Sequence, residues 1–94
     1  YFEYGQNRRV KLVTTTGTWY LSSSMKNLEK QMQSYGFLVP HKSFLVNPGQ
    51  ILSFGAEIEM KNHEMIPIAK NRRKQVHEQI SEYLHNHLNI NWRD

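Results

Sequence analysis

The chain has 94 residues and no cysteine, with 12 Lys and Arg against 8 Asp and Glu, for a net charge of +4. This length makes one small domain over residues 1–94, and the lack of cysteine excludes disulfide frameworks and thiolate zinc sites. No apolar run approaches the roughly 18 residues of a membrane-spanning helix, so we expect no membrane contact. Because Tyr1 starts within a strand pattern and without Met, we expect a fragment of a longer protein.

The N-terminal third alternates like a β-hairpin and then changes to helical spacing. Val10 and Leu12 alternate along one arm, and Trp19 and Leu21 along the returning arm, which predicts inward-facing positions on both. Apolar residues then recur three and four positions apart behind a serine cap, which predicts an internal helix over about 24–35.

The rest of the chain is β-rich until a second helical pattern begins. Residues 37–47 are predicted to form strands, but the segment around Pro40 must be an edge strand or a loop. A further hairpin has Asn62 and His63 at its tip, and because a type I′ turn prefers Gly after Asn, this tip is strained or longer than two residues. An apolar stripe predicts a C-terminal helix over about 71–88 that packs against the sheets. The fold class is therefore mainly β with short helices.

Cations crowd the start of that last helix. Four of the 12 cations fall within residues 70–74, where the helix dipole favours carboxylates and each exposed cation costs about 0.3–1 kcal/mol. A solvated charged face is one interpretation. The other is a phosphate-binding turn, because unpaired N–H groups at a helix start and the cations attract the same anion. The cluster consists of Lys70, Asn71, Arg72, Arg73 and Lys74.

No set of residues indicates catalysis. His41 and Ser43 lie two apart in one extended segment, without a marked acid partner or a Gly-x-Ser-x-Gly elbow, so we expect no enzyme. We expect His41 to tie down backbone groups in a loop that exposes Lys42. The other histidines lack the spacing of a zinc motif, so we expect neither a metal nor a cofactor.

The chain resembles the LytTR family of bacterial DNA-binding domains over two stretches, FLVPHKSFLVNPGQI and IEMKNHEMIPIAKNRRKQV. The family signature runs Phe-x-Arg-x-His-Arg/Lys-Ser-aromatic-aliphatic-Val-Asn, with Ile four residues later and an Ile-Pro-aliphatic-Ser segment before a basic turn. Val39, His63 and Ala69 depart from it, standing where the family has Arg, Gly and Ser. The matching positions are Phe37, His41, Lys42, Ser43, Phe44, Val46, Asn47, Ile51, Ile66, Pro67 and Ile68.

The resemblance implies a fold and a function. The fold is an elongated structure of packed short β-sheets, which in the family begins with strands upstream of the position of Tyr1, so N-terminal strands would be missing here. The function is sequence-specific binding of double-stranded DNA by loops in the major groove. The resemblance further implies a cytoplasmic bacterial protein, the transcription-regulating output domain of a response regulator in a two-component system, with a second copy on paired direct repeats.

Carried over by motif, three loops of this chain contact DNA. We expect Arg9 and Arg72 to contact bases, with Lys42 as a third candidate braced by His41, while Lys70, Arg73 and Lys74 hold phosphates. The full set of expected DNA-binding residues is Asn7, Arg8, Arg9, His41, Lys42, Lys70, Asn71, Arg72, Arg73 and Lys74.

Two other binding functions are compatible with a basic patch. A protein-interaction module would use the turn 70–74 to dock an acidic partner, and it would share the salt sensitivity of a DNA-binding domain but not its sequence preference. An RNA-binding domain needs an exposed aromatic platform, and we interpret Tyr20 and Phe44 instead as core residues of strands.

Overall fold

The computed structural model describes residues 1–5 and 9–87. These residues form eight strands, two α-helices and two short 3-10 turns. In chain order the elements are β1 (Phe2–Tyr4), β2 (Arg9–Thr14), β3 (Gly17–Ser22), α1 (Met25–Gln33), β4 (Leu38–His41), β5 (Phe44–Val46), η2 (Pro48–Gln50), β6 (Ile51–Phe54), β7 (Glu57–Met60), β8 (Met65–Pro67), η3 (Lys70–Arg72) and α2 (Arg73–His87).

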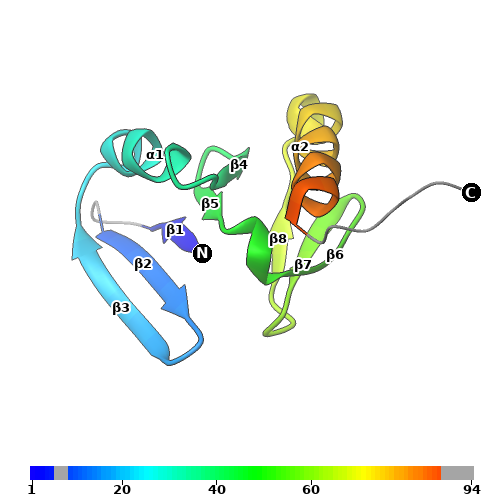
Figure 1. Cartoon of the computed structure of the whole chain (residues 1–94). Helices are drawn as coiled ribbons and strands as arrows, with labels where there is room; N and C mark the ends of the chain where they lie inside the picture. The colour runs from blue at the N-terminus through cyan, green and yellow to red at the C-terminus, as the bar shows by residue number, and fades with distance from the viewer. Residues whose placement is uncertain (6–8, 88–94) are drawn as a thin grey trace, which may run out of the picture.

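The strands make two antiparallel sheets (Figure 1). The five-stranded sheet has the order β3-β2-β1-β5-β4, and the three-stranded sheet has the order β6-β7-β8. The molecule measures 50 × 31 × 25 Å. The expected fold class, elongated and mainly β with packed short sheets, is therefore confirmed.

One face of the five-stranded sheet packs against α1. Ser24 caps this helix by accepting a hydrogen bond from the Asn27 N–H at 3.1 Å, which satisfies one of the free donors of the first turn. Leu28, the buried residue of the helix, joins Val10 and Leu45 of the sheet in one hydrophobic cluster. The predicted helix and the inward side of its hairpin thus form the first core.

The central strand β5 contributes to a second core as well. Neighbouring side chains of a strand point to opposite faces, so Leu45 enters the core under α1 while Val46 enters the other, and both are fully buried. In the second core Val46 meets Ile58 of the three-stranded sheet and Ile80 of α2. This shared strand joins the two halves, and the expected packing of the terminal helix against a sheet is confirmed.

Pro40 and the second hairpin behave as their sequences indicate. Pro40 lies in β4, the outer strand of its sheet, where a missing N–H donor costs no ladder bond. The second hairpin has four residues between Met60 and Met65, and His63 there has a φ of 71°. The Nδ1 of His63 lies 3.0 Å from Oε2 of Glu59, and this hydrogen bond is the main cause that lowers the pKa of Glu59.

The aromatic residues of β3 do not follow the prediction. Trp19 lies opposite Leu12, on the face that was predicted to be inward, but it is 48% exposed. Tyr20 is 59% exposed, so the expectation of a core Tyr20 is wrong. The strand pairs Trp19 with Leu12 and Tyr20 with Lys11. Since β3 is the outermost strand of the sheet, its large side chains reach beyond the area that the buried core fills.

Candidate nucleic-acid interface

Backbone hydrogen bonds hold the start of β2 and the turn between β4 and β5 at the same end of the five-stranded sheet. The N–H of Gly5 donates to the carbonyl of Arg9 at 2.9 Å, and the N–H of Tyr4 donates to the carbonyl of Ser43 at 2.8 Å. Strand β1 lies between β2 and β5 and pairs with both. Arg9 and Lys42 are therefore close to one end of the sheet although they are far apart in sequence.

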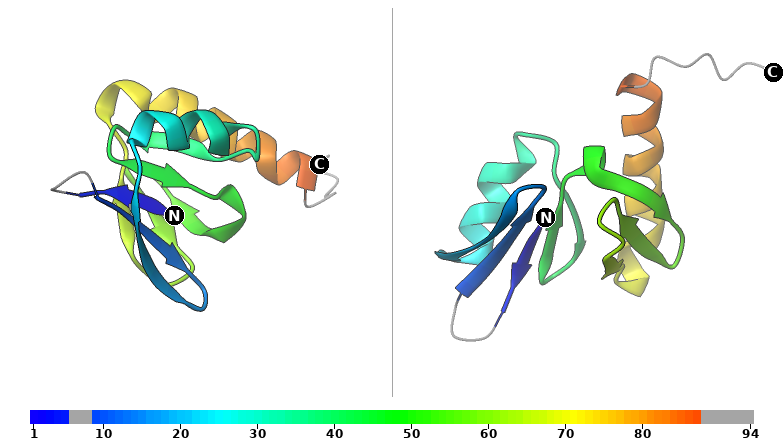
Figure 2. Two further views of the ribbon diagram at one scale, coloured as in Figure 1. Left: turned by 90° about the vertical axis from the view of Figure 1, so that its left-hand side faces the viewer. Right: turned by 90° about the horizontal axis from the view of Figure 1, so that it is seen from below.

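A second set of contacts joins the cationic turn, residues 70–74, to β4. The N–H of Ala69 donates to the carbonyl of Pro40 at 2.8 Å, and Nη1 of Arg72 donates to the carbonyl of Val39 at 3.1 Å. In both views of Figure 2 the start of β2, the β4–β5 turn and the start of α2 lie along one side of the molecule. We call this side the basic edge; its residues are Arg9, Lys42, Lys70, Asn71, Arg72, Arg73 and Lys74.

The turn between β4 and β5 presents one cation on a braced backbone. The Nδ1 of His41 accepts a hydrogen bond from the Ser43 N–H at 3.1 Å, and the His41 ring meets the ring of Phe44 edge-on with centroids 5.8 Å apart. Lys42, between them, is exposed. The expectation that His41 ties down backbone groups is confirmed, and the result is a fixed turn with a free ammonium group.

Arg9 is supported by an aromatic ring. Its guanidinium carbon lies 5.5 Å from the ring centroid of Tyr20, within the range of a cation–π interaction. Arg9 pairs with Ser22 across the hairpin, two residues along from Tyr20, so the two side chains share one face of the sheet. Arg9 itself is exposed, so the ring orients the guanidinium without covering it.

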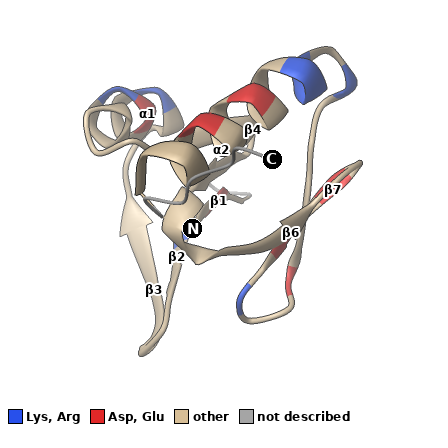
Figure 3. Ribbon diagram, turned by 45° about the vertical axis from the view of Figure 1, so that its right-hand side comes forward, with Lys and Arg blue, Asp and Glu red and all other residues tan. Residues whose placement is uncertain are grey.

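The cationic turn is tighter than predicted, and the helix begins later. Lys70–Arg72 form a 3-10 turn and α2 starts at Arg73, with no side-chain cap at Ala69. Only Arg73 and Lys74 therefore belong to the first turn of the helix, where four cations were expected. Figure 3 shows Lys and Arg at the start of α2 and Glu farther along it. Lys70, Asn71 and Lys74 are exposed.

The two arginines of this turn are partly buried. Arg72 uses one of the five N–H donors of a guanidinium for its bond to Val39. Arg73 has a buried Nε atom without a hydrogen-bond partner in the part of the chain that the structure describes. An unsatisfied buried donor on a charged group is destabilising by about 1–3 kcal/mol.

Some expected features lie outside the described residues or are not found within them. Asn7 and Arg8, two of the expected DNA contacts, and Leu88 of the helical stripe lie outside the described ranges. Within those ranges no three His, Cys, Asp or Glu side chains gather in a way that could hold a metal ion. No described helix is both long and apolar enough to cross a membrane.

Two antiparallel β-sheets with cations along one edge define a mainly β protein whose surface is suited to a polyanionic ligand. The comparison with protein families identifies it more closely, because the family model for the LytTr DNA-binding domain matches residues 1–81. The chain belongs to the LytTR family, and it is a DNA-binding domain. No curated protein sequence matches the chain closely enough to add to this assignment.

One contributor to the basic edge was missed in the sequence. Tyr20 was assigned to the core, yet its ring supports Arg9. The register of the hairpin was the signal that could have found it, because counting back from a turn at residues 15 and 16 places Lys11 opposite Tyr20 and Arg9 opposite Ser22. A tyrosine flanked across the hairpin by two cations is an unlikely core residue.

Proposed function

We propose that this domain reads a specific sequence of double-stranded DNA by placing its loops in the major groove. The observation that carries the proposal is the basic edge, where hydrogen bonds between β1, β4 and their neighbours gather cations from three separate loops. A continuous row of Lys and Arg on one side of a domain matches a phosphate backbone. Loops on braced backbones can carry side chains to base edges without a recognition helix.

The cations divide into two roles. Arg9 and Arg72 contact base edges, since an Arg fork can bind O6 and N7 of guanine together, and Lys42 is the third such residue. Asn71 contacts adenine, since an Asn amide can bind N6 and N7 together. The side chains of Lys70, Arg73 and Lys74 hold phosphates and set the position of the domain on the duplex. Asn7 and Arg8, which precede Arg9 in the sequence, complete the proposed contact set.

The bound DNA would also remove a repulsion that the free domain carries. Arg73 and Lys74 stand at the positive end of the α2 dipole with no acidic residue in the first turn. Phosphates placed there are attracted by the cations and by the positive end of the helix dipole together. Neutralising about five phosphates should lower the affinity roughly 500-fold between 50 and 200 mM salt.

We infer the regulatory setting from what is typical of LytTR domains. We place the domain in the bacterial cytoplasm as the transcription-regulating output of a response regulator, with two copies on paired direct repeats. Two copies on one duplex double the phosphate contacts, and each copy raises the effective concentration of the other if they touch.

The experiment that tests the proposal is selection from a pool of randomised duplexes, repeated at 50 and 200 mM salt. We expect enrichment of a short motif, present in two copies per bound duplex, and a steep loss of binding at the higher salt. A duplex of scrambled sequence and equal length is the control for sequence-independent attraction.

Two other outcomes would contradict the proposal. Salt-sensitive binding with no enriched motif would leave only a cationic surface, and docking of an acidic protein partner would then explain the basic edge better. Absence of binding at low salt, from a sample with a cooperative thermal transition, would overturn DNA binding by this domain.

A further inference from the structure

A groove separates the two helices on the side of β4 that faces away from β5. It has a volume of about 740 Å³, which lies within the range of pockets that bind ligands. Figure 1 shows α1 and α2 on either side of β4, and the chain from Gly36 to Val39 forms the floor. The groove and the basic edge share one residue, Arg72, which lies at one end of the groove.

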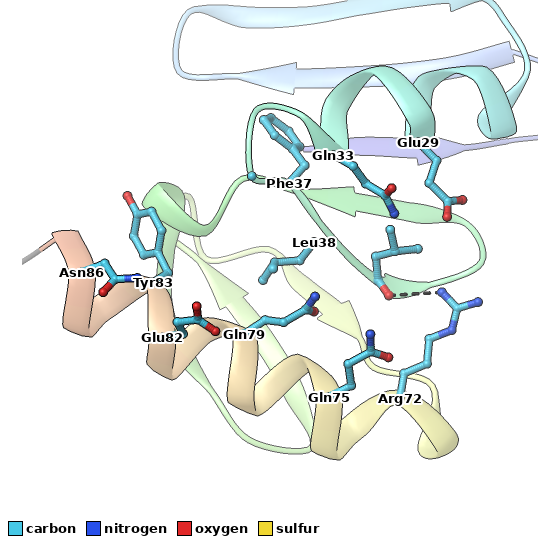
Figure 4. A pocket seen from close by; sticks show the side chains of 12 residues that line it. Glu29, Gln33, Phe37, Leu38, Arg72, Gln75, Gln79, Glu82, Tyr83 and Asn86 are labelled. Atoms are coloured by element: carbon cyan, nitrogen blue, oxygen red, sulfur yellow. Dashed lines mark hydrogen bonds between the residues drawn. The ribbon is translucent and has the colours of Figure 1, made fainter.

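The walls of the groove are two rows of polar side chains (Figure 4). On α2 the residues Gln75, Gln79 and Glu82 follow each other at helical spacing, while the buried Val76 and Ile80 between them face the core. The α1 wall carries Glu29 and Gln33, four residues apart. Each helix thus presents its apolar stripe to a core and a polar stripe to the groove.

The groove side chains have few partners among themselves. Of the 12 residues drawn in Figure 4, all within the described ranges, one has a side chain that is hydrogen-bonded to another of them, Arg72 to the carbonyl of Val39. The carboxamides of Gln33, Gln75 and Gln79 each offer a donor and an acceptor. An extended peptide presents the same two groups along its backbone, so facing rows of carboxamides suit it on both sides.

The charges of the groove select the kind of peptide. Glu29 and Glu82 place one carboxylate on each wall, and they would repel the phosphates of a nucleic acid. The one cation of the lining, Arg72, already donates to Val39. We propose that this groove binds an extended peptide segment of a partner protein, with Lys or Arg side chains that pair with Glu29 and Glu82. The proposal goes beyond DNA binding and does not depend on it.

The test begins with a displayed library of random 12-residue peptides, panned on the wild-type domain and counter-selected on the Glu29→Gln/Glu82→Gln variant. Selected peptides are then synthesised and titrated against both proteins. The matched control is Glu57→Gln/Glu78→Gln, which changes the net charge equally at two exposed positions outside the groove. Thermal unfolding verifies that every variant is folded.

We expect the selected peptides to carry at least two cations and to bind roughly tenfold more weakly to the groove variant, at about threefold for each exposed ion pair. The control variant should keep wild-type affinity. NMR amide shifts caused by the peptide should fall on residues 29–39 and 72–86. Equal loss in both variants, shifts that fall elsewhere, or failure to enrich any peptide would overturn the proposal.

Discussion

Arg9 and Arg72 were given the same role from sequence, but the structure holds them differently. Arg9 is exposed and touches the fold through the ring of Tyr20, 5.5 Å away. Arg72 is half-buried, and its Nη1 donates to the carbonyl of Val39 at 3.1 Å. Arg9 thus lies on the surface of a sheet, whereas Arg72 connects the cationic turn to the edge strand β4.

This difference separates contacts that serve the ligand from contacts that also serve the fold. An exposed arginine can be removed with little effect on the free protein. A half-buried arginine that bonds to a backbone carbonyl leaves that carbonyl without its partner when it is removed. Substitutions at the two positions should therefore have different effects on stability even if both reduce DNA affinity.

Arg72→Ala should have the largest effect, because it removes a proposed base contact and a structural hydrogen bond together. We expect the DNA affinity to fall by about 1–3 kcal/mol and the free energy of unfolding by about 1 kcal/mol. Fluorescence anisotropy with the selected duplex and urea unfolding measure the two quantities. Specificity at one base should relax as well.

The control for this variant is Lys70→Ala, two residues earlier in the same turn and exposed. It should weaken binding to all sequences alike, reduce the salt slope by about one phosphate and leave unfolding unchanged. If Arg72→Ala behaved in the same way as Lys70→Ala, the Val39 contact would have no role in the fold.

Arg9→Ala should lower the affinity for the selected duplex by about 1–3 kcal/mol and leave the free energy of unfolding within about 0.5 kcal/mol of wild type. The affinity for scrambled DNA should fall less, because only one cation is lost from the non-specific attraction. A competition titration with both duplexes measures the ratio. An equal loss on both duplexes would show that Arg9 holds a phosphate and reads no base.

The sequence predicted well those helices, strands and turns whose pattern involves only neighbouring residues. Apolar spacing identified both helices, and Pro40 was correctly limited to an outer strand. The hairpin tip was predicted to be strained or longer than two residues, and it has four residues with His63 at a positive φ, because the preference for Gly in short turns is local. These features depend on neighbouring residues, so a single sequence contains them.

The sequence predicted that the C-terminal helix packs against a sheet, but it did not predict individual contacts between distant elements. The bond from Arg72 to Val39 joins residues 33 positions apart, and no spacing rule indicates it. The exposure of Trp19, which shares the core face with Leu12, depends on the place of β3 at the outside of the sheet, which the alternation of one strand does not reveal. Helix α2 starts only at Arg73 because Lys70–Arg72 form a 3-10 turn. This turn directly follows Ala69, whose N–H donates to the distant carbonyl of Pro40.

His41→Ala tests the third loop of the basic edge and should have a smaller effect. It removes the acceptor of the Ser43 N–H, so we expect the free energy of unfolding to fall by about 0.5–1.5 kcal/mol. DNA affinity should fall a few-fold, because the freed turn no longer fixes Lys42. His41→Asn, which keeps an acceptor near the same place, should recover part of both losses; no recovery would point to the Phe44 contact instead.

The smallest expected effect, and the sharpest test of how Arg9 is held, comes from Tyr20. Replacing the ring with an aliphatic chain in Tyr20→Leu removes a cation–π interaction of about 0.5–1 kcal/mol at an exposed site, so DNA affinity should fall roughly two- to fivefold. Tyr20→Phe keeps the ring and should bind as the wild type does. Tyr35→Leu is the matched control, because Tyr35 is 76% exposed at the end of α1.

The loss should also disappear when Arg9 is absent. If Tyr20 acts by orienting Arg9, adding Tyr20→Leu to Arg9→Ala should cost nothing further, and a double-mutant cycle measures this coupling directly. An additive double variant would mean that Tyr20 contacts DNA by itself. In that case the DNA would contact the exposed ring of Tyr20 in β3 directly, and Tyr20 would not act through Arg9.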